Sequence, residues 1–486
     1  MKGFVMIKRR KSLKLNMVLN AIKGLMGIIF PLITFPYVSR VLGVDNLGRY
    51  NFSNSIISYF ILIAGLGIST YAVREGARLR NNHELFQNFA NEMFTINMVS
   101  TIVAYLGIGI LLFGSPKMQE YKALLLILSL LIIFRTIGIE WIYSIFEDYA
   151  YITIRSIVFQ FISLLLLFTM VKTENDVEIY ALVTVISSGG SGILNYLHAK
   201  KYCQIKLTAK VDWKRHMRPI LVLFATAVTV TIYTSSDVTI LGLLCGDTSV
   251  GLYSVSAKVY SLVKTILSSV LIVSISRLSA MLGCNDRVAF NDTATDIYKT
   301  LISLVLPALV GIILLRKEII LILADETYLQ ATNSLALLSV ALFFCLGAWF
   351  WGQCILVPFQ KETTVFWATV ISALVNIVLN LVLIPHWEQD AAAFTTVLAE
   401  GIAFVWCSLK ARRLVKMNGI GVIYIKALIG CASIVLVSAL TQHLIADLIS
   451  RTIVTVIMSA VLYGIVEIVL KNEAMESLMK VLKRKT

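Results

Sequence analysis

Charged residues are scarce in this chain. Only 15% of its 486 residues are Asp, Glu, Lys or Arg, whereas 58% are hydrophobic, and the mean hydropathy is +0.83. A water-soluble protein of this length could not solvate so apolar a surface. The shortage of charge therefore excludes a soluble globular protein and indicates a polytopic membrane protein.

Motifs of common catalytic and nucleotide-binding sites are also missing. The sequence contains no G-x-x-x-x-G-K-[ST] loop and no H-E-x-x-H zinc motif. Its five histidines are isolated, and its seven cysteines lack metal-ligand spacing. The loops are too short to shape the extracytoplasmic catalytic site of a polymerase or a lipid-linked glycosyltransferase. We therefore expect a carrier with no catalytic residues, no metal and no cofactor.

Apolar segments follow one another almost without pause. Runs of about 18 or more apolar residues are long enough to cross a bilayer as helices, and the alternating pattern of membrane strands is absent. We expect an all-α fold with about fourteen transmembrane helices. They are predicted at 15–42, 50–72, 88–113, 121–145, 149–171, 177–199, 217–244, 250–276, 296–315, 329–357, 363–385, 391–409, 421–442 and 450–470.

Basic residues are distributed unevenly between the loops. The chain has 43 Lys and Arg against 28 Asp and Glu, an excess that could suggest nucleic-acid binding. The basic residues concentrate in alternate loops, however, such as 8–14, 200–218 and 410–416. This positive-inside bias predicts a multi-pass protein of the cytoplasmic membrane with both termini in the cytoplasm, surrounded by the lipid bilayer and with no nucleic-acid partner.

One stretch of the sequence recurs about two hundred residues later. LGVDNLGRYNFSNSIISY at 42–59 is similar to LCGDTSVGLYSVSAKVYS at 244–261, and a shift of 203 positions places Gly48 on Gly251. Six predicted spans separate the copies, so both cross the membrane in the same direction, as parallel repeats do. We expect the two glycines to form a tight outer turn in each copy.

The repeat predicts two parallel six-helix lobes. The first lobe is expected at 1–212 and the second at 213–417. Residues 418–486 then form an additional two-helix appendage with a basic cytoplasmic tail.

The segment 31–80 carries a family resemblance. Its features are Pro36-Tyr37, the run 39–43, Gly48 with Tyr50, and the run 65–75. It resembles the amino-terminal signature of Wzx-type polysaccharide flippases, which belong to the multidrug/oligosaccharidyl-lipid/polysaccharide exporter superfamily. The resemblance implies a two-lobed, MATE-like fold and export of an undecaprenyl-diphosphate-linked oligosaccharide for O-antigen, capsule or a similar polymer. Polysaccharide polymerases and glycosyltransferases are the implied partners.

Ionisable residues inside predicted spans are expensive in lipid and are therefore candidates for function. The deep charges are predominantly basic, which suits an anionic diphosphate head group. Candidates for substrate binding are Lys23, Arg40, Arg135, Lys258 and Lys264. Candidates for ion coupling or structural ion pairs are Asp237, Glu140 and Glu400.

Several of these residues have a purely structural alternative. Asp237 and Lys258 lie at one depth on neighbouring predicted helices and could form a structural pair. Arg155 and Glu467 lie near predicted helix ends, where we expect their side chains to extend to the interface. The glycine-rich run 187–192 is expected to serve helix packing.

Trp349, Trp351 and Trp367 are expected to act as interfacial anchors, with sugar stacking as the alternative.

Two functions remain open from the sequence. The first is a flippase that works by alternating access of the lobes. The second is a proton- or sodium-coupled multidrug or small-molecule exporter of the same superfamily, which would need deep carboxylates for a cationic cargo. A proton or sodium gradient remains open as the source of energy.

Overall fold

The computed structural model describes residues 13–284 and 286–473 and is built from helices. Within these residues, eleven helices are long and apolar enough to cross a membrane. The prediction of a polytopic, all-α membrane protein is therefore confirmed. Two spanning helices, 24–79 and 362–411, each contain two of the predicted spans, and the predicted span 121–145 is interrupted, which explains the lower number. The number of fourteen stays a prediction.

The chain divides into two compact units between Thr239 and Ile240. This boundary lies within helix α10 (Trp213–Leu244), so most of α10 belongs to the first unit. The lobe boundaries expected near 212 and 417 stay predictions.

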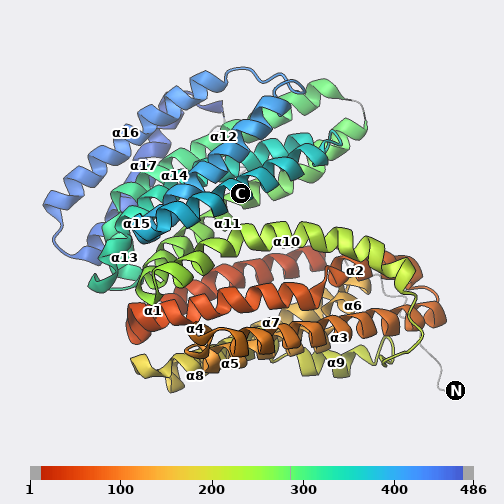
Figure 1. Cartoon of the computed structure of the whole chain (residues 1–486). Coiled ribbons are helices and arrows are strands. Elements are labelled where there is room, and N and C mark those ends of the chain that lie inside the picture. The colour runs from red at the N-terminus through yellow and green to blue at the C-terminus, as the bar shows by residue number, and fades with distance from the viewer. Residues whose placement is uncertain (1–12, 285, 474–486) are drawn as a thin grey trace. The chain divides into compact units, whose positions relative to one another are not determined.

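The first unit is a bundle of long helices with several short interruptions (Figure 1). Its core includes the fully buried side chains of Phe86, Met93 and Tyr143. Besides α10, its elements are α1 (Leu13–Gly65), α2 (Ile68–Leu79), α3 (His83–Gly114), α4 (Pro116–Gln119), α5 (Lys122–Gly138), α6 (Glu140–Ile145), α7 (Tyr149–Met170), the 3-10 turn η1 (Glu174–Asp176), α8 (Val177–Gly189) and α9 (Gly192–Ala199).

The second unit contains the remaining helices. Its core includes Phe290, Leu346 and Phe350. Trp351 is 2% exposed in this core, so the expectation of an interfacial anchor was wrong at this position. The elements are α11 (Asp247–Gly283), α12 (Arg287–Leu314), α13 (Arg316–Leu323), η2 (Glu326–Ala331), α14 (Thr332–Trp349), the π-helical turn η3 (Phe350–Leu356), α15 (Glu362–Ala411), α16 (Ile420–Leu444) and α17 (Leu448–Val469).

The last two helices are fastened to α12 by polar contacts. The Tyr463 hydroxyl donates to the carbonyl of Ser303 at 2.8 Å, and Lys299 pairs with Glu473 at 2.5 Å. Glu467 is fully buried beside this contact, and the Asn472 amide donates to its carboxylate. The expectation that Glu467 extends to the interface was therefore wrong, because α17 packs against α16, which in turn packs on α12, and this packing encloses the side chain.

The duplicated stretch adopts the same backbone turn twice, but five residues earlier than predicted. Gly43 has φ 70° and ψ 176°, and Gly246, 203 positions later, has φ 92° and ψ −169°. These positive φ values favour glycine. Gly48 and Gly251 instead lie buried within helices, so their assignment to the turn was wrong.

The segment that connects α9 to α10 is bound to α3 along its length. Three α3 side chains, each one turn apart, accept from its backbone: Gln87 from Gln204, Asn91 from Lys206 and Thr95 from Thr208.

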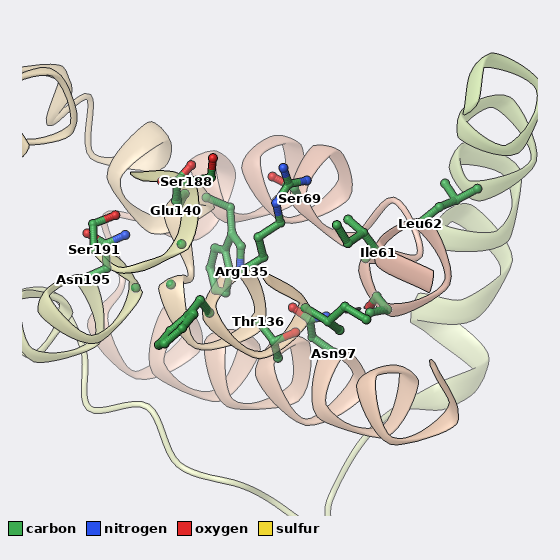
Figure 2. Close-up of a pocket in the computed structure, with 18 of the residues that line it drawn as sticks. Ile61, Leu62, Ser69, Asn97, Arg135, Thr136, Glu140, Ser188, Ser191 and Asn195 are labelled. Atoms are coloured by element: carbon green, nitrogen blue, oxygen red, sulfur yellow. Dashed lines mark hydrogen bonds between the residues drawn. The ribbon is translucent and has the colours of Figure 1, made fainter. Parts of the chain in front are cut away.

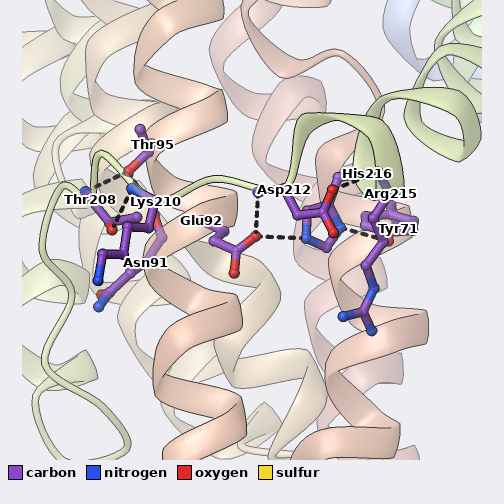
Figure 3. A network of polar contacts seen from close by, with 9 residues as sticks. All are labelled: Tyr71, Asn91, Glu92, Thr95, Thr208, Lys210, Asp212, Arg215 and His216. Atoms are coloured by element: carbon purple, nitrogen blue, oxygen red, sulfur yellow. Dashed lines mark hydrogen bonds and ion pairs between the residues drawn. The ribbon is translucent and has the colours of Figure 1, made fainter.

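A buried histidine completes this attachment. His216, 2% exposed, contacts the Tyr71 hydroxyl at 2.8 Å and the Glu92 carboxylate at 2.9 Å, as Figure 3 shows. Because Glu92 also accepts from the backbone of Asp212, the first turn of α10 is fixed to α2 and α3.

Candidate functional site

A cavity of about 530 Å³ lies within the first unit (Figure 2). Its wall combines small, polar and apolar side chains from several helices. The lining residues are Ile61, Leu62, Ala64, Gly65, Gly67, Ser69, Asn97, Ile132, Phe134, Arg135, Thr136, Gly138, Glu140, Trp141, Ser188, Gly189, Ser191, Gly192 and Asn195.

Three helices are interrupted where they meet this cavity. The break between α1 and α2 lies at Leu66 and Gly67, which have φ of 45° and 74°. The break between α5 and α6 lies at Ile139, with φ 37°, and a third separates α8 from α9. Irregular backbone within a membrane is tolerated where it is enclosed by protein or lines a polar cavity. Discontinuous helices of this kind commonly form the binding sites of transporters.

The interruptions turn helix N-termini and free hydroxyl groups toward the cavity. Ser69 lies in the first turn of α2, and Gly192 begins α9. Helix N-termini carry a partial positive charge and unpaired N–H groups, which suit an anion. Ser69, Ser188 and Ser191 line the wall, and their hydroxyls have no protein partner among the described residues. The cavity therefore offers donors for both phosphate and sugar oxygens.

Among the predicted cations whose side chains the structure describes, Arg135 alone lines this cavity. It lies in the last turn of α5, is exposed, and makes no ion pair within 4 Å to a carboxylate of the described residues. In Figure 2 its side chain lies among Ser69, Thr136 and Glu140. A guanidinium remains charged at all physiological pH values and can bind a phosphate through two parallel hydrogen bonds.

Glu140, the acidic residue of the same wall, is paired with an arginine outside the cavity lining. Glu140 forms an ion pair with Arg155 at 2.5 Å, and the Arg155 side chain is only 6% exposed. The expectation that Arg155 extends to the interface was wrong, because its helix α7 packs it beside α6. Glu140 thus has a structural partner, and its charge does not cancel that of Arg135.

The glycine-rich run 187–192 has two roles. A Cβ atom at Gly192 would lie 2.4 Å from the carbonyl oxygen of Phe134, and one at Gly189 would lie 2.9 Å from the Phe134 Cβ. These glycines therefore allow the α8–α9 break to pack against α5, as the sequence suggested. Ser188 and Ser191 of the same run line the cavity.

In the second unit, the predicted charges contact other side chains. The Lys264 ammonium lies 5.5 Å from the centre of the Tyr260 ring, and the Tyr260 hydroxyl donates to Glu400 at 3.4 Å. Glu400 is 5% exposed and interacts electrostatically with Lys264. Two candidates from different parts of the sequence, Lys264 and Glu400, are thus brought together in one cluster.

The remaining candidates with described side chains do not line the cavity. Arg40 is exposed on α1, three residues before the turn at Gly43. Asp237 is 7% exposed on α10 in the first unit, whereas Lys258 is half-buried on α11 in the second. Their pairing stays a prediction. Lys23 lies on α1, and its side chain is outside the described part of the structure.

Several wall residues were not singled out from the sequence. Ser69, Asn97, Asn195 and Trp141 are common residue types without a motif. Asn195 is 1% exposed, and its amide oxygen has no hydrogen-bond partner among the described residues. The signal that could have identified them is the group of helix interruptions, and nothing in a single apolar run marks the break at Ile139.

Comparisons with known proteins place the chain in a family. A sequence model described as "Polysaccharide biosynthesis protein" matches residues 13–282. A protein of Escherichia coli (strain K12) named "Putative O-antigen transporter" is 20% identical over 277 residues, which cover 56% of this chain and 66% of the relative. A protein of the same name from Shigella dysenteriae is 21% identical over 47% of this chain and 58% of its own length. The matches thus span less than two thirds of these relatives.

Solved structures show the same fold. The lipid II flippase MurJ in an inward closed conformation has a TM-score of 0.74 at 18% identity, over 94% of this chain and 99% of its own. An inward-facing MATE family multidrug transporter has a TM-score of 0.61 at 13% identity, over 82% of this chain and 98% of its own. The predicted MATE-like fold is therefore confirmed.

The family model covers more than half of the chain and includes the whole signature segment 31–80. The resemblance predicted from that segment is confirmed, and the chain belongs to the polysaccharide biosynthesis protein family of membrane transporters.

Proposed function

We propose that this protein is a flippase that moves undecaprenyl-diphosphate-linked oligosaccharide units across the cytoplasmic membrane for surface polysaccharide synthesis. Alternating access would expose the cavity of the first unit to each side in turn, while the polyprenyl chain stays in the lipid. The relatives named as O-antigen transporters and the MurJ-like fold support this class of substrate. Polymerases and glycosyltransferases of the same pathway are the proposed partners.

The observation that carries the proposal is Arg135 in a cavity with three helix breaks. The guanidinium has no carboxylate partner among the described residues, and Glu140 is held by Arg155. Two charges 4 Å apart attract by about 4 kcal/mol at an effective dielectric constant of 20, against about 1 kcal/mol in water. A diphosphate in this cavity would therefore recover part of the free energy that it loses on leaving water.

The sugar portion needs a different kind of contact. The free hydroxyls of Ser188 and Ser191 and the unpartnered amide oxygen of Asn195 can exchange hydrogen bonds with sugar hydroxyls. Trp141 adds an aromatic surface to the same wall. The wall therefore provides sites for both parts of a lipid-linked oligosaccharide.

A coupled exporter of cationic small molecules is the alternative. It would require a free carboxylate in the cavity, whereas Glu140, the acidic residue of the wall, is already paired. The buried Glu400 lies beside Lys264, which likewise reduces its attraction for a cation. We therefore favour the anionic substrate.

The decisive experiment is charge reversal at Arg135. In cells that depend on this protein for their surface polymer, Arg135→Glu should lower the polymer at least tenfold at normal protein levels, because a carboxylate repels the diphosphate. Arg135→Lys keeps the charge and should keep a measurable part of the activity. Purified variants should show the same order when a fluorescent polyprenyl-diphosphate oligosaccharide is moved across reconstituted vesicles.

The matched control is Lys122→Glu at the other end of the same helix. Lys122 is exposed and does not line the cavity. The variant Lys122→Glu should therefore support normal polymer levels. Unchanged polymer in Arg135→Glu would contradict the proposed role of the cation.

A further inference from the structure

A second groove lies at the two ends of α15 in the second unit. Its volume is about 340 Å³. Glu388, with φ 47°, interrupts α15, and both arms of this helix contribute to the groove. Its lining residues are Thr363, Thr364, Trp367, Ile371, Trp406 and Lys410, and we call it the Trp367 groove.

The lining residues follow helical spacing on each arm. Thr363, Trp367 and Ile371 recur every four residues on the first arm, and Trp406 and Lys410 do the same on the second. Residues four apart share one helix face. Each arm thus presents one face to the groove, with an indole from each side.

Donor groups of the groove are left without protein partners. The Lys410 ammonium, the Thr363 hydroxyl and both indole N–H groups make no hydrogen bond to any of the described residues. Trp367 is 52% exposed and Trp406 is 37% exposed. Tryptophans with this exposure at helix ends are typical of the boundary between lipid tails and head groups.

The charge of the groove and its surroundings is positive. Lys410 is the charged lining residue, and the exposed Arg412, Arg413 and Lys416 follow it in sequence. The carboxylate of Glu362 lies nearby in sequence, at the first turn of α15, but does not line the groove. A basic cluster directly beside a transmembrane helix attracts anionic lipids.

We propose that the Trp367 groove is a binding site for the head group of an anionic phospholipid. The phosphodiester would lie against Lys410 and the Thr363 hydroxyl, and the indoles of Trp367 and Trp406 would enclose the glycerol region. The groove lies beside the basic residues of 410–416, which the predicted orientation places on the cytoplasmic side of the membrane. This inference depends on the membrane location of the chain and not on the proposed flippase activity.

The number of cations in the groove favours a phosphodiester over a diphosphate. One ammonium lines the groove, which matches the single negative charge of the phosphodiester in phosphatidylglycerol. A polyprenyl diphosphate carries two or more charges and would leave at least one unpaired in a partly apolar groove. The apolar contribution of Ile371 and the two indoles fits the upper part of lipid acyl chains.

The test uses brominated lipids, which quench nearby tryptophan fluorescence. The full chain is placed in mixed vesicles in which either phosphatidylglycerol or phosphatidylcholine carries brominated acyl chains. The contribution of the groove is the difference between the parent and the variant Trp367→Phe/Trp406→Phe. We expect this contribution to be quenched preferentially by brominated phosphatidylglycerol, and Lys410→Gln to lower that preference about fivefold.

The control is Lys361→Gln, an exposed lysine at the start of α15 that does not line the groove. It should keep the full preference. Equal quenching by the two lipids, or an unchanged preference in Lys410→Gln, would overturn the proposal. Displacement of brominated phosphatidylglycerol by a polyprenyl diphosphate at lower concentrations than by unlabelled phosphatidylglycerol would also overturn it, because the groove would then bind substrate.

Discussion

Arg135 in the first unit and Lys264 in the second, both predicted to bind substrate, have opposite surroundings. In the first unit, Arg135 lies in the wall of a cavity and makes no ion pair to a described carboxylate. In the second, Lys264 lies against the ring of Tyr260 and interacts with the buried Glu400. One cation is available to a ligand and the other is already engaged.

Helix continuity accounts for this difference. Arg135 lies four residues before the break at Ile139, and two further breaks meet the same cavity. Lys264 lies in the middle of α11, which runs from Asp247 to Gly283. A continuous helix satisfies its own backbone and lets neighbours pack against it, whereas broken helices leave polar groups that keep a cavity open. The two units therefore carry two different kinds of charged site.

The largest expected effect is on the ion pair of the first unit. Glu140→Ala leaves Arg155 buried without its partner, because the Nε and Nη1 atoms of Arg155 already lack partners among the described residues. We expect the free energy of unfolding to fall by about 3 kcal/mol. Unfolding in mixed detergent micelles, followed by circular dichroism, measures it. If the double variant Glu140→Gln/Arg155→Met regains the parent's stability, the unpaired charge is the cause of the loss. If Glu140→Ala is as stable as the parent, the ion pair does not stabilise the fold.

A second variant alters the helix break itself. In Gly192→Ala the new Cβ would lie 2.4 Å from the Phe134 carbonyl oxygen, so α9 and α5 must move apart. We expect a loss of about 1–3 kcal/mol in the free energy of unfolding and a further loss of transport, since the cavity wall shifts. Gly109→Ala on α3, with no atom within 4 Å of the new Cβ, is the matched control and should be neutral or slightly stabilising, because alanine is the better helix former. Equal stability of the two variants would show that the α5–α9 contact is not tight.

A smaller effect is expected in the second unit. Tyr260→Phe removes the hydrogen bond to Glu400 but keeps the ring beneath Lys264, and should lower the free energy of unfolding by about 1 kcal/mol. Tyr260→Leu also removes the ring and should lower it further, by about 0.5–1 kcal/mol. The same micelle titration compares them. A larger effect of Tyr260→Phe on transport than on stability would place this cluster in the transport cycle.

The smallest effect is expected at two loops, one in each unit, in which an aspartate accepts hydrogen bonds from nearby backbone N–H groups. Backbone N–H groups of Lys172 and Thr173 lower the pKa of Asp176, and that of Ser450 lowers the pKa of Asp447. Because each aspartate has a lower pKa in the folded than in the unfolded chain, it stabilises the folded state at every pH above the unfolded pKa, which is near 3.9. This contribution is lost as the pH falls through the folded pKa. Thermal unfolding at pH 7 and pH 3 should therefore differ less in Asp176→Asn/Asp447→Asn than in the parent. An identical pH dependence would contradict this role.

Much of the fold could be predicted from the sequence. Hydropathy identified the apolar helices, and the repeat identified two equivalent turns, although the glycines that form them are Gly43 and Gly246. The exact turn was missed because Gly48 and Gly251 are equally compatible with a turn in an apolar context. A second pair of equivalent positions, Glu147 and Gln360, lies 213 residues apart in the similar stretches 146–154 and 359–367, and both residues have φ 56°.

The site was less predictable. Arg135 stood out because charge is costly at its depth, but the same rule also selected Lys264, which packs against Tyr260. Depth along a helix does not determine which face a side chain occupies. Arg155 and Glu467 show the converse, because their positions near helix ends suggested exposure although neighbouring helices bury them.

The attachment of residues 204–216 to α3 has a consequence for how the chain could be divided. The backbone of this connection is hydrogen-bonded to α3 at Gln204, Lys206 and Thr208. It is therefore part of the first unit and does not act as a flexible linker between the two units. A gene split after residue 239 would keep His216 and this whole connection with its own partners, whereas a split at residue 212 would separate His216 from Glu92. Co-expressed halves should therefore reassemble more efficiently from the first division than from the second.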